Sequence, residues 1–478
     1  MGLLKNYFYN IGYQVLNMIL PLITGPYIAR VLGPEGVGIN TYTGAVIQYF
    51  VLFGGLGIAL YGNRQIAYVK SDKKELSITF WEIQIIKIVT VLLAYLLFLI
   101  YLALVHQYRF YLVLQSLYII ATGFDISWLY EGVEDFKKTF TRNTLVRITS
   151  LVLILLFVHK SSDVWLYILI LAISNLGGYI ALWPTISKVI KPIRIKQLNP
   201  LRHLPGTLAL FIPYLTLNVY PIINKTLLKH FCGVTSSGYY EKSDVMVRMA
   251  LAFLTSLGTV MLPHTSKAFS DGKVDLTRRL LQKSFSLVSM MAFPIAFGMA
   301  AIAPKFGTFF YGIGFRPVNA ALFIESFAIV FMGWSSITGT QYLIPTRQTK
   351  YYTYSVILGS IINILLDVPL IIIFGLNGAA LATTISEGFI ATFQLVSIRN
   401  QVNYRNWYQN ILKYFASAMI MFFMVYYLNK NLYMNIWTLI IEILIGFLIY
   451  GIMLILTQPK DLSVVKSIVE KAMKRIFP

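Results

Sequence analysis

The feature that most constrains this chain is a series of long apolar runs separated by short loops. An α-helix needs about 20 apolar residues to cross the hydrocarbon of a bilayer. Of the 478 residues 57% are hydrophobic and only 12% are charged, whereas soluble domains carry about twice that share of charge. A core surrounded by water could not hide so much apolar surface. The sequence therefore predicts an all-α membrane protein.

The apolar runs predict fourteen membrane spans joined by short loops. The spans cover roughly residues 9–30, 39–62, 80–104, 110–131, 143–159, 164–186, 207–228, 238–262, 284–304, 318–341, 351–374, 377–398, 412–428 and 435–456. The first ten residues lack a signal-peptide cleavage pattern, so the first run is expected to remain as a span.

An internal repeat divides these spans into two lobes. A shift of the chain by 200 residues aligns Pro21, Ile23, Gly33, Gly38 and Phe53 with Pro221, Ile223, Gly233, Gly238 and Phe253. The pattern predicts an N-lobe (1–186, spans 1–6), a cytoplasmic linker (187–206), a C-lobe (207–398, spans 7–12), spans 13–14 (399–456) and a tail (457–478). Two repeats in the same orientation are a known transporter plan.

The distribution of basic residues predicts that both termini are cytoplasmic. With the N-terminus inside, 28 of the 40 Lys and Arg lie on the inner side, seven lie outside and five lie within spans. Membrane proteins show this bias. The basic residues form no continuous patch, so the net charge of +21 does not indicate nucleic-acid binding. Residues 461–477 predict a basic amphipathic helix on the inner leaflet.

The chain offers little for metal, cofactor or nucleotide chemistry. Its one cysteine, Cys232, excludes an intrachain disulfide framework and a multi-cysteine metal site. Its five histidines are scattered, and no two have the spacing of metal ligands. No G-x-x-x-x-G-K-[ST] loop is present, so ATP is not the expected driver. We expect no cofactor.

Ionisable residues within the spans are the first site candidates, because a charge near the bilayer centre costs from ~3 to ~10 kcal/mol or more. Glu241, Asp244 and Arg248 share one face of span 8 at i, i+3 and i+7. We interpret this face as the wall of a polar cavity, and a self-neutralising packing ladder is the alternative. Glu82 and Lys87, five residues apart in span 3, are predicted to form a structural pair.

Asn363 and Asp367 lie four residues apart in span 11, so their oxygens face one side. A small cation site requires such an arrangement, and an internally hydrogen-bonded polar patch is the alternative. For Arg30 and Arg147, which lie near span ends, the alternative to a cavity role is snorkelling to the interface.

Four stretches resemble a known family. DISWLYEGVEDFKKTFTRNTLVR at 125–147, GYYEKSDVMVR at 238–248 and SLGTVMLPHTSKA at 256–268 resemble Wzx-type flippases of polysaccharide repeat units. ARVLGPEGVG at 29–38 is similar to the wider multidrug, oligosaccharidyl-lipid and polysaccharide exporter superfamily, which includes lipid II flippases and MATE extruders. The resemblance covers essentially the whole chain.

The resemblance implies a two-lobed, MATE-like V arrangement with pseudo-twofold symmetry, a central cationic cavity and alternating access. Arg30 falls where lipid II flippases have a cavity arginine. We expect the substrate-binding cations to be Arg30, Arg147, Lys225, Lys242 and Arg248. We expect the acidic or coupling residues to be Asp125, Glu241, Asp244, Asn363, Asp367 and Thr383.

The resemblance also bears on the coupling ion. Asn363, Asp367 and Thr383 match in spacing the sodium-binding positions of some lipid II flippases. The span-7 member of such a site is usually an aspartate just before a lysine. Here Asn224 precedes Lys225, so one carboxylate is missing. The coupling ion therefore stays open between a proton, sodium and the membrane potential alone.

The expected function is a flippase in the bacterial inner membrane that moves undecaprenyl-diphosphate-linked oligosaccharide repeat units outward, for capsule or O-antigen assembly. The expected partners are that polyprenyl-diphosphate-linked glycan, membrane lipid and a polysaccharide polymerase. A MATE-like drug or cation extruder is the first alternative, and its cavity should favour carboxylates. A membrane enzyme such as a polymerase is the second, but the outer loops of about 4–14 residues leave little room for a catalytic site. We therefore expect no enzyme.

Overall fold

The computed structural model describes residues 2–402 and 405–459. Every regular element in these residues is a helix, which confirms the all-α prediction. The chain forms two compact units, Met1–Gly238 and Tyr239–Pro478. The first unit includes predicted span 7. The predicted amphipathic helix at 461–477 lies outside the described residues.

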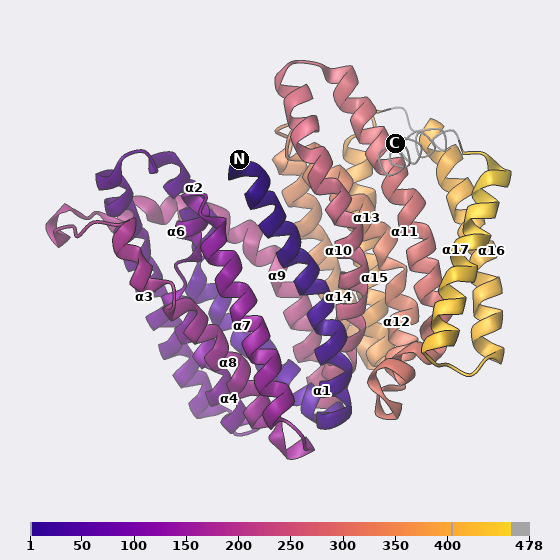
Figure 1. Ribbon diagram of the computed structural model, residues 1–478, viewed down its shortest axis with the longest axis horizontal. Helices are drawn as coiled ribbons and strands as arrows, with labels where there is room; N and C mark the ends of the chain where they lie inside the picture. The colour runs from indigo at the N-terminus through magenta and orange to yellow at the C-terminus, as the bar shows by residue number, and fades with distance from the viewer. Residues whose placement is uncertain (1, 403–404, 460–478) are drawn as a thin grey trace. The chain divides into compact units, whose positions relative to one another are not determined.

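The first unit is built on α1, which packs against α3, α7 and α9 (Figure 1). Its α-helices are α1 (Gly2–Gly55), α2 (Ile58–Val69), α3 (Lys73–Leu104), α4 (Arg109–Gln115), α5 (Leu117–Phe124), α6 (Ser127–Gly132), α7 (Phe136–Phe157), α8 (Val164–Ile180) and α9 (Leu204–Cys232). The linker between α8 and α9 contains the short 3-10 turns Trp183–Lys188, Ile195–Gln197 and Pro200–His203.

The second unit is built on α11, which packs against α12, α13 and α16. Its α-helices are α10 (Val234–Ser270, beginning in the first unit), α11 (Val274–Tyr311), α12 (Val318–Ser326), α13 (Ala328–Ser335), α14 (Thr349–Phe374), α15 (Leu376–Ser397), α16 (Arg405–Asn431) and α17 (Ile436–Thr457). A π-helical segment, Ser336–Leu343, follows α13. Helices α14 and α15 pack together, as do α16 and α17, drawn in yellow tones in Figure 1.

The predicted count of fourteen spans is approximate. By length and composition, ten helices of the described residues can cross a membrane, or up to twelve if each of two bent helix pairs is one span. The run Leu20–Val69 counts once among the ten, although it holds predicted span 2 and half of span 1. Predicted span 8 lies on α10, which is not among the ten.

Glycines of the sequence repeat stand where the backbone needs them. Gly33, which breaks α1, and Gly233, between α9 and α10, both have positive φ, 69° and 88°, a conformation that glycine adopts at no steric cost. A Cβ on Gly38 would lie 2.2 Å from the carbonyl oxygen of Val234, and one on Gly238 would lie 2.8 Å from the Gly38 nitrogen. The repeated glycines therefore allow a helix break and a close approach of two helix starts.

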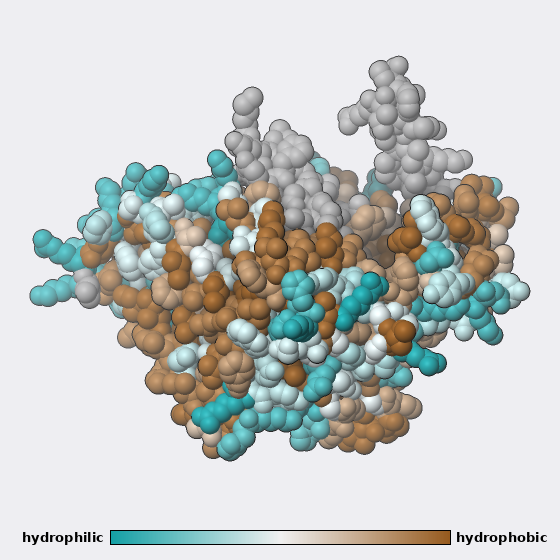
Figure 2. All heavy atoms as spheres, turned by 60° about the horizontal axis from the view of Figure 1, so that its bottom comes forward, coloured by the Kyte–Doolittle hydropathy of each residue, from teal (hydrophilic) through white to brown (hydrophobic). Residues whose placement is uncertain are grey.

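The surface of both units is apolar over broad areas, which appear brown in Figure 2. On α3, for example, Leu92, Leu93 and Leu96 are 58%, 56% and 56% exposed, and on α17 Phe447 and Leu448 are 70% and 65% exposed. Water-soluble monomers rarely expose contiguous patches of this kind. The chain is a multi-pass membrane protein whose lipid-facing surface is formed by these side chains.

Candidate functional site

The predicted polar face of α10 forms an ion pair. Arg248 Nε donates to both carboxylate oxygens of Asp244 at 2.8 Å, because residues four apart on a helix lie on one face. The Asp244 side chain is 5% exposed, whereas the Arg248 side chain is 40% exposed. The buried carboxylate thus fixes the guanidinium of a side chain that is itself partly exposed.

A third carboxylate joins this face from α12. Glu325 is fully buried and accepts a hydrogen bond from Ser243 Oγ at 2.5 Å. It lies within electrostatic range of Asp244, Arg248 and Glu241. The sequence marked Glu325 only as an acidic residue within a span and did not place it beside α10. Helix periodicity reveals neighbours within one helix, whereas Ser243 and Glu325 are 82 residues apart in the chain.

Lys242 belongs to the same turn of α10 and contacts α11. Its Nζ lies 5.4 Å from the ring centroid of Tyr311, whose hydroxyl donates to the Lys242 carbonyl at 3.2 Å. Glu241 lies within electrostatic range of the Lys242 ammonium. The α10 site therefore mixes two cations with three carboxylates, and its chemistry suits a charged, hydrogen-bonding ligand.

The predicted cation site on α14 and α15 is fully buried. Asn363, Asp367 and Thr383 all have 0% exposure. Gly359 of α14 lies against Ile390 of α15, and Gly378 of α15 lies against Leu370 of α14. The two helices therefore run antiparallel, and this register places Asp367 opposite about residue 382, next to Thr383. The Thr383 hydroxyl hydrogen-bonds the Tyr240 hydroxyl at 2.9 Å. Elsewhere, too, the described residues hold no group of three or more His, Cys, Asp or Glu suited to a metal ion. Sodium binding by this trio stays a prediction.

In the first unit, Asp125 pairs with Lys87 of α3. The Lys87 side chain is 3% exposed, and its Nζ lies 2.6 Å from the Asp125 carbonyl oxygen and 3.5 Å from its carboxylate. The carboxylate also accepts from the backbone N–H of Ser127 at 2.9 Å and from the Ser127 hydroxyl. The predicted pair of Glu82 and Lys87 is wrong, because residues five apart point to different sides of a helix.

Glu82 instead ties the linker to α3. Its carboxylate, 1% exposed, accepts from the Asn199 backbone at 2.6 Å and from Arg202 Nε at 2.8 Å, and it lies 2.9 Å from His203 Nε2. His203 Nδ1 lies 2.8 Å from the Tyr61 hydroxyl. This network fixes the start of α9, which follows directly after His203.

The remaining predicted cations lie on three helices of the first unit. Arg30 is exposed on α1, Arg147 is half-buried on α7, and Lys225 is half-buried on α9. Arg142 was not among the predicted site residues, because predicted span 5 begins only at about residue 143. In the structure Arg142 lies on α7, with its guanidinium 4.5 Å from the Tyr179 ring and within electrostatic range of Asp125.

Two family models match this chain. The model described as polysaccharide biosynthesis protein matches residues 3–269, and the model described as lipid II flippase MurJ matches residues 139–448. The chain is also 24% identical, over 405 residues, to a protein assigned as an O-antigen transporter in Escherichia coli (strain K12). That alignment covers 84% of this chain and 97% of the relative.

Two solved structures are similar in fold. A lipid II flippase MurJ in an inward closed conformation has a TM-score of 0.73 at 18% identity, over 94% of this chain and 98% of that one. An inward-facing multidrug resistance MATE family transporter of the MOP superfamily has a TM-score of 0.62 at 14% identity, over 80% and 93%. These likenesses confirm the predicted MATE-like fold.

Proposed function

The chain belongs to the polysaccharide biosynthesis protein family, and we propose that it is a flippase for undecaprenyl-diphosphate-linked oligosaccharide repeat units. It moves them from the inner to the outer leaflet by alternating access, for the assembly of cell-surface polysaccharide such as capsule or O-antigen. Similarity to an O-antigen transporter over 97% of that protein's length supports this substrate class. The observation that carries the proposal is the Arg248–Asp244 pair on α10.

Arg248 is suited to a diphosphate. Its Nε is occupied by Asp244, which fixes the plane of the guanidinium. The side chain is 40% exposed, and we assign the donors of its two Nη atoms to the ligand. Guanidinium binds phosphate through paired, charge-assisted hydrogen bonds, which replace the water that the diphosphate loses. We assign supporting roles along the path to Arg30, Arg147, Lys225 and Lys242.

The energy source follows from charge. With the cytoplasm negative, moving two phosphate charges outward is favoured by ~4–5 kcal/mol per 100 mV if they cross the whole field. Any coupling by a proton or sodium ion is assigned to Asp125, Glu241, Asp244, Asn363, Asp367 and Thr383. A polysaccharide polymerase that consumes the flipped unit is the partner class we propose.

One observation favours a second candidate function. Around α10 the carboxylates of Glu241, Asp244 and Glu325 outnumber the cations Lys242 and Arg248. An extruder of organic cations would use such a surplus of negative charge. The transport assay below separates the two substrates.

Reconstituted protein is expected to flip a lipid-linked glycan and not a cationic dye. Full-length protein is incorporated into liposomes with a fluorescent polyprenyl-diphosphate glycan, and a membrane-impermeant quencher reports which leaflet holds the fluorophore. We expect loss of the protected fraction only in vesicles that contain protein, because the polar head cannot cross hydrocarbon unaided. A cationic dye in parallel vesicles is the control. Dye movement without glycan movement would assign the extruder function instead.

The orientation can be tested with the chain's single cysteine. Cys232 ends α9, is half-buried, and falls on the outer side in the orientation that the basic residues predict. A membrane-impermeant maleimide is expected to label Cys232 in right-side-out vesicles without permeabilisation. A Cys232→Ser variant is the control for background labelling. Labelling that requires permeabilisation would place this end of α9 in the cytoplasm.

A further inference from the structure

The first unit contains a pocket that the proposed diphosphate chemistry does not use. It encloses about 360 Å³ among α1, α3 and α9, within the ~300–1,000 Å³ range of small-molecule sites. Aromatic side chains dominate its wall, namely Tyr42, Tyr49, Phe50 and Tyr101. Lys229 and His230, from the last turn of α9, complete it.

The aromatic wall is held in place by its neighbours. The Phe50 ring packs against Phe98 and Tyr101, with ring centroids 5.5 and 5.9 Å apart. The Tyr49 hydroxyl hydrogen-bonds Thr226 Oγ1 of α9 at 3.2 Å. Rigid aromatic faces edged with hydroxyls combine an apolar surface with hydrogen-bonding groups. A pyranose ring has the same combination, with C–H groups on its faces and hydroxyls on its rim.

The charge in the pocket is positive. The Lys229 ammonium lies 4.9 Å from the ring centroid of Tyr42 and 5.9 Å from that of Tyr108, and it donates to Gln107 Oε1 at 2.7 Å. Among the described residues, none that lines the pocket is acidic. Glu35 lies within electrostatic range of Tyr108 but does not line the pocket. The pKa of the Tyr108 hydroxyl is raised, chiefly by burial and secondly by the Glu35 carboxylate. That phenol therefore stays uncharged and does not offset the lysine.

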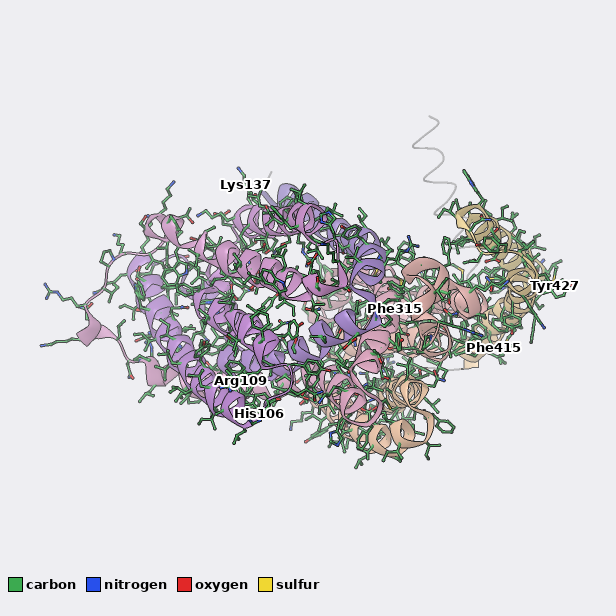
Figure 3. The ribbon with its side chains drawn as sticks, turned by 90° about the horizontal axis from the view of Figure 1, so that it is seen from below. His106, Arg109, Lys137, Phe315, Phe415 and Tyr427 are labelled. Carbon is green, nitrogen blue, oxygen red and sulfur yellow. The ribbon has the colours of Figure 1, made fainter. Side chains whose placement is uncertain are left out.

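Further basic side chains lie at this end of the unit. His106 and Arg109 flank Tyr108 in sequence and are exposed. In Figure 3 both lie along the same edge of the first unit. In the predicted orientation this end faces outward, where the glycan head arrives after transport.

We propose that this pocket is a sugar-binding subsite on the outer side, which receives an acidic sugar residue of the transported glycan. The aromatic rings stack against the pyranose, and Lys229 pairs with its carboxylate. The inference rests on the proposed function, since it assigns the pocket to the glycan of that substrate. It adds a specificity site that reads the sugar, separate from the α10 site for the diphosphate.

Cys232 gives a direct readout of the pocket. It lies three residues after Lys229 on α9, so the two side chains share a helix face. In full-length protein, the rate of maleimide labelling of Cys232 is measured in the presence of cellobiuronic acid or of cellobiose. The two disaccharides differ only in one group, which is a carboxylate in cellobiuronic acid and a hydroxymethyl group in cellobiose. We expect cellobiuronic acid to slow labelling at least threefold and cellobiose to slow it less.

Two variants test the role of the lysine. Lys229→Gln is expected to abolish protection by cellobiuronic acid, because it removes the positive charge and keeps a polar, hydrogen-bonding side chain. Lys430→Gln, which removes an exposed outer lysine of the other unit, is expected to leave protection unchanged. Equal labelling rates with and without cellobiuronic acid would overturn the proposal. Protection that survives Lys229→Gln, or equal protection by cellobiose, would overturn it as well.

Transport separates this proposal from the proposed function. With a lipid-linked glycan that contains a uronic acid, Lys229→Gln is expected to raise the half-saturating concentration about tenfold, the effect of one lost charge-assisted contact. A neutral lipid-linked glycan should be flipped equally well by both proteins. Normal kinetics on the acidic glycan would overturn the subsite while the flippase stands. Protection of Cys232 without flipping of either glycan would refute the flippase and leave a sugar-binding pocket.

Discussion

Arg248→Ala is expected to abolish glycan transport. The substitution removes the guanidinium that we assign to the diphosphate and leaves Asp244, 4% exposed, without that partner. Removing one member of a fully buried pair costs about 3–5 kcal/mol. Because the Arg248 side chain is 40% exposed, we expect a smaller loss of stability, about 1–3 kcal/mol.

A double variant separates stability from transport. Asp244→Asn with Arg248→Gln removes both charges and keeps a polar side chain at each position, so no carboxylate is stranded there. We expect it to unfold within about 1 kcal/mol of the wild type. Transport in the liposome assay should nevertheless stay at background, because glutamine cannot supply a positive charge to the diphosphate.

Arg248→Lys is the matched control. It retains a cation beside Asp244 but loses the planar donor set of the guanidinium. We expect intermediate transport, below the wild type and above the double variant. Wild-type rates in the folded double variant would remove Arg248 from the substrate path and leave the α10 pair as a packing ladder.

The sequence predicted those features of the fold that depend on interactions within one helix or one turn. Run lengths predicted an all-helical membrane protein, and helix periodicity predicted that Asp244 and Arg248 lie on one face. The predicted spans also left Gly33 and Gly233 between helices, and in the structure both have positive φ. In each case the cause lies within one helix or one turn, so the sequence alone contains the information.

Partners from other helices could not be predicted in this way. Glu325 reaches Ser243 across 82 residues of sequence, and Glu82 reaches His203 across 121. The incorrect pairing of Glu82 with Lys87 came from nearness in sequence, whereas both side chains find partners that only tertiary packing brings close. The aromatic pocket was missed for the same reason, since α1, α3 and α9 each contribute only part of its wall.

Substitutions of Lys87 and Asp125 are expected to have strongly non-additive effects on the free energy of unfolding. Both side chains are shielded from solvent, at 3% and 15% exposure, so a charge left alone there cannot recover its hydration. We expect Lys87→Met and Asp125→Asn each to lower the free energy of unfolding by about 3–5 kcal/mol. The measurement is denaturant or thermal unfolding of the purified protein in detergent.

The double variant Lys87→Met with Asp125→Asn should recover most of the loss from either single change. Methionine fills the volume of the lysine stem, and the asparagine oxygen still accepts from the Ser127 backbone N–H, which now lies 2.9 Å from the carboxylate. A loss in the double variant that is well below the sum of the two single losses is the signature of such a contact. Additive losses would contradict the pairing. Transport by the folded double variant then decides the role of Asp125. If Asp125 couples transport to an ion, its replacement by an amide should abolish transport. If Asp125 only neutralises Lys87, the double variant should still transport the glycan.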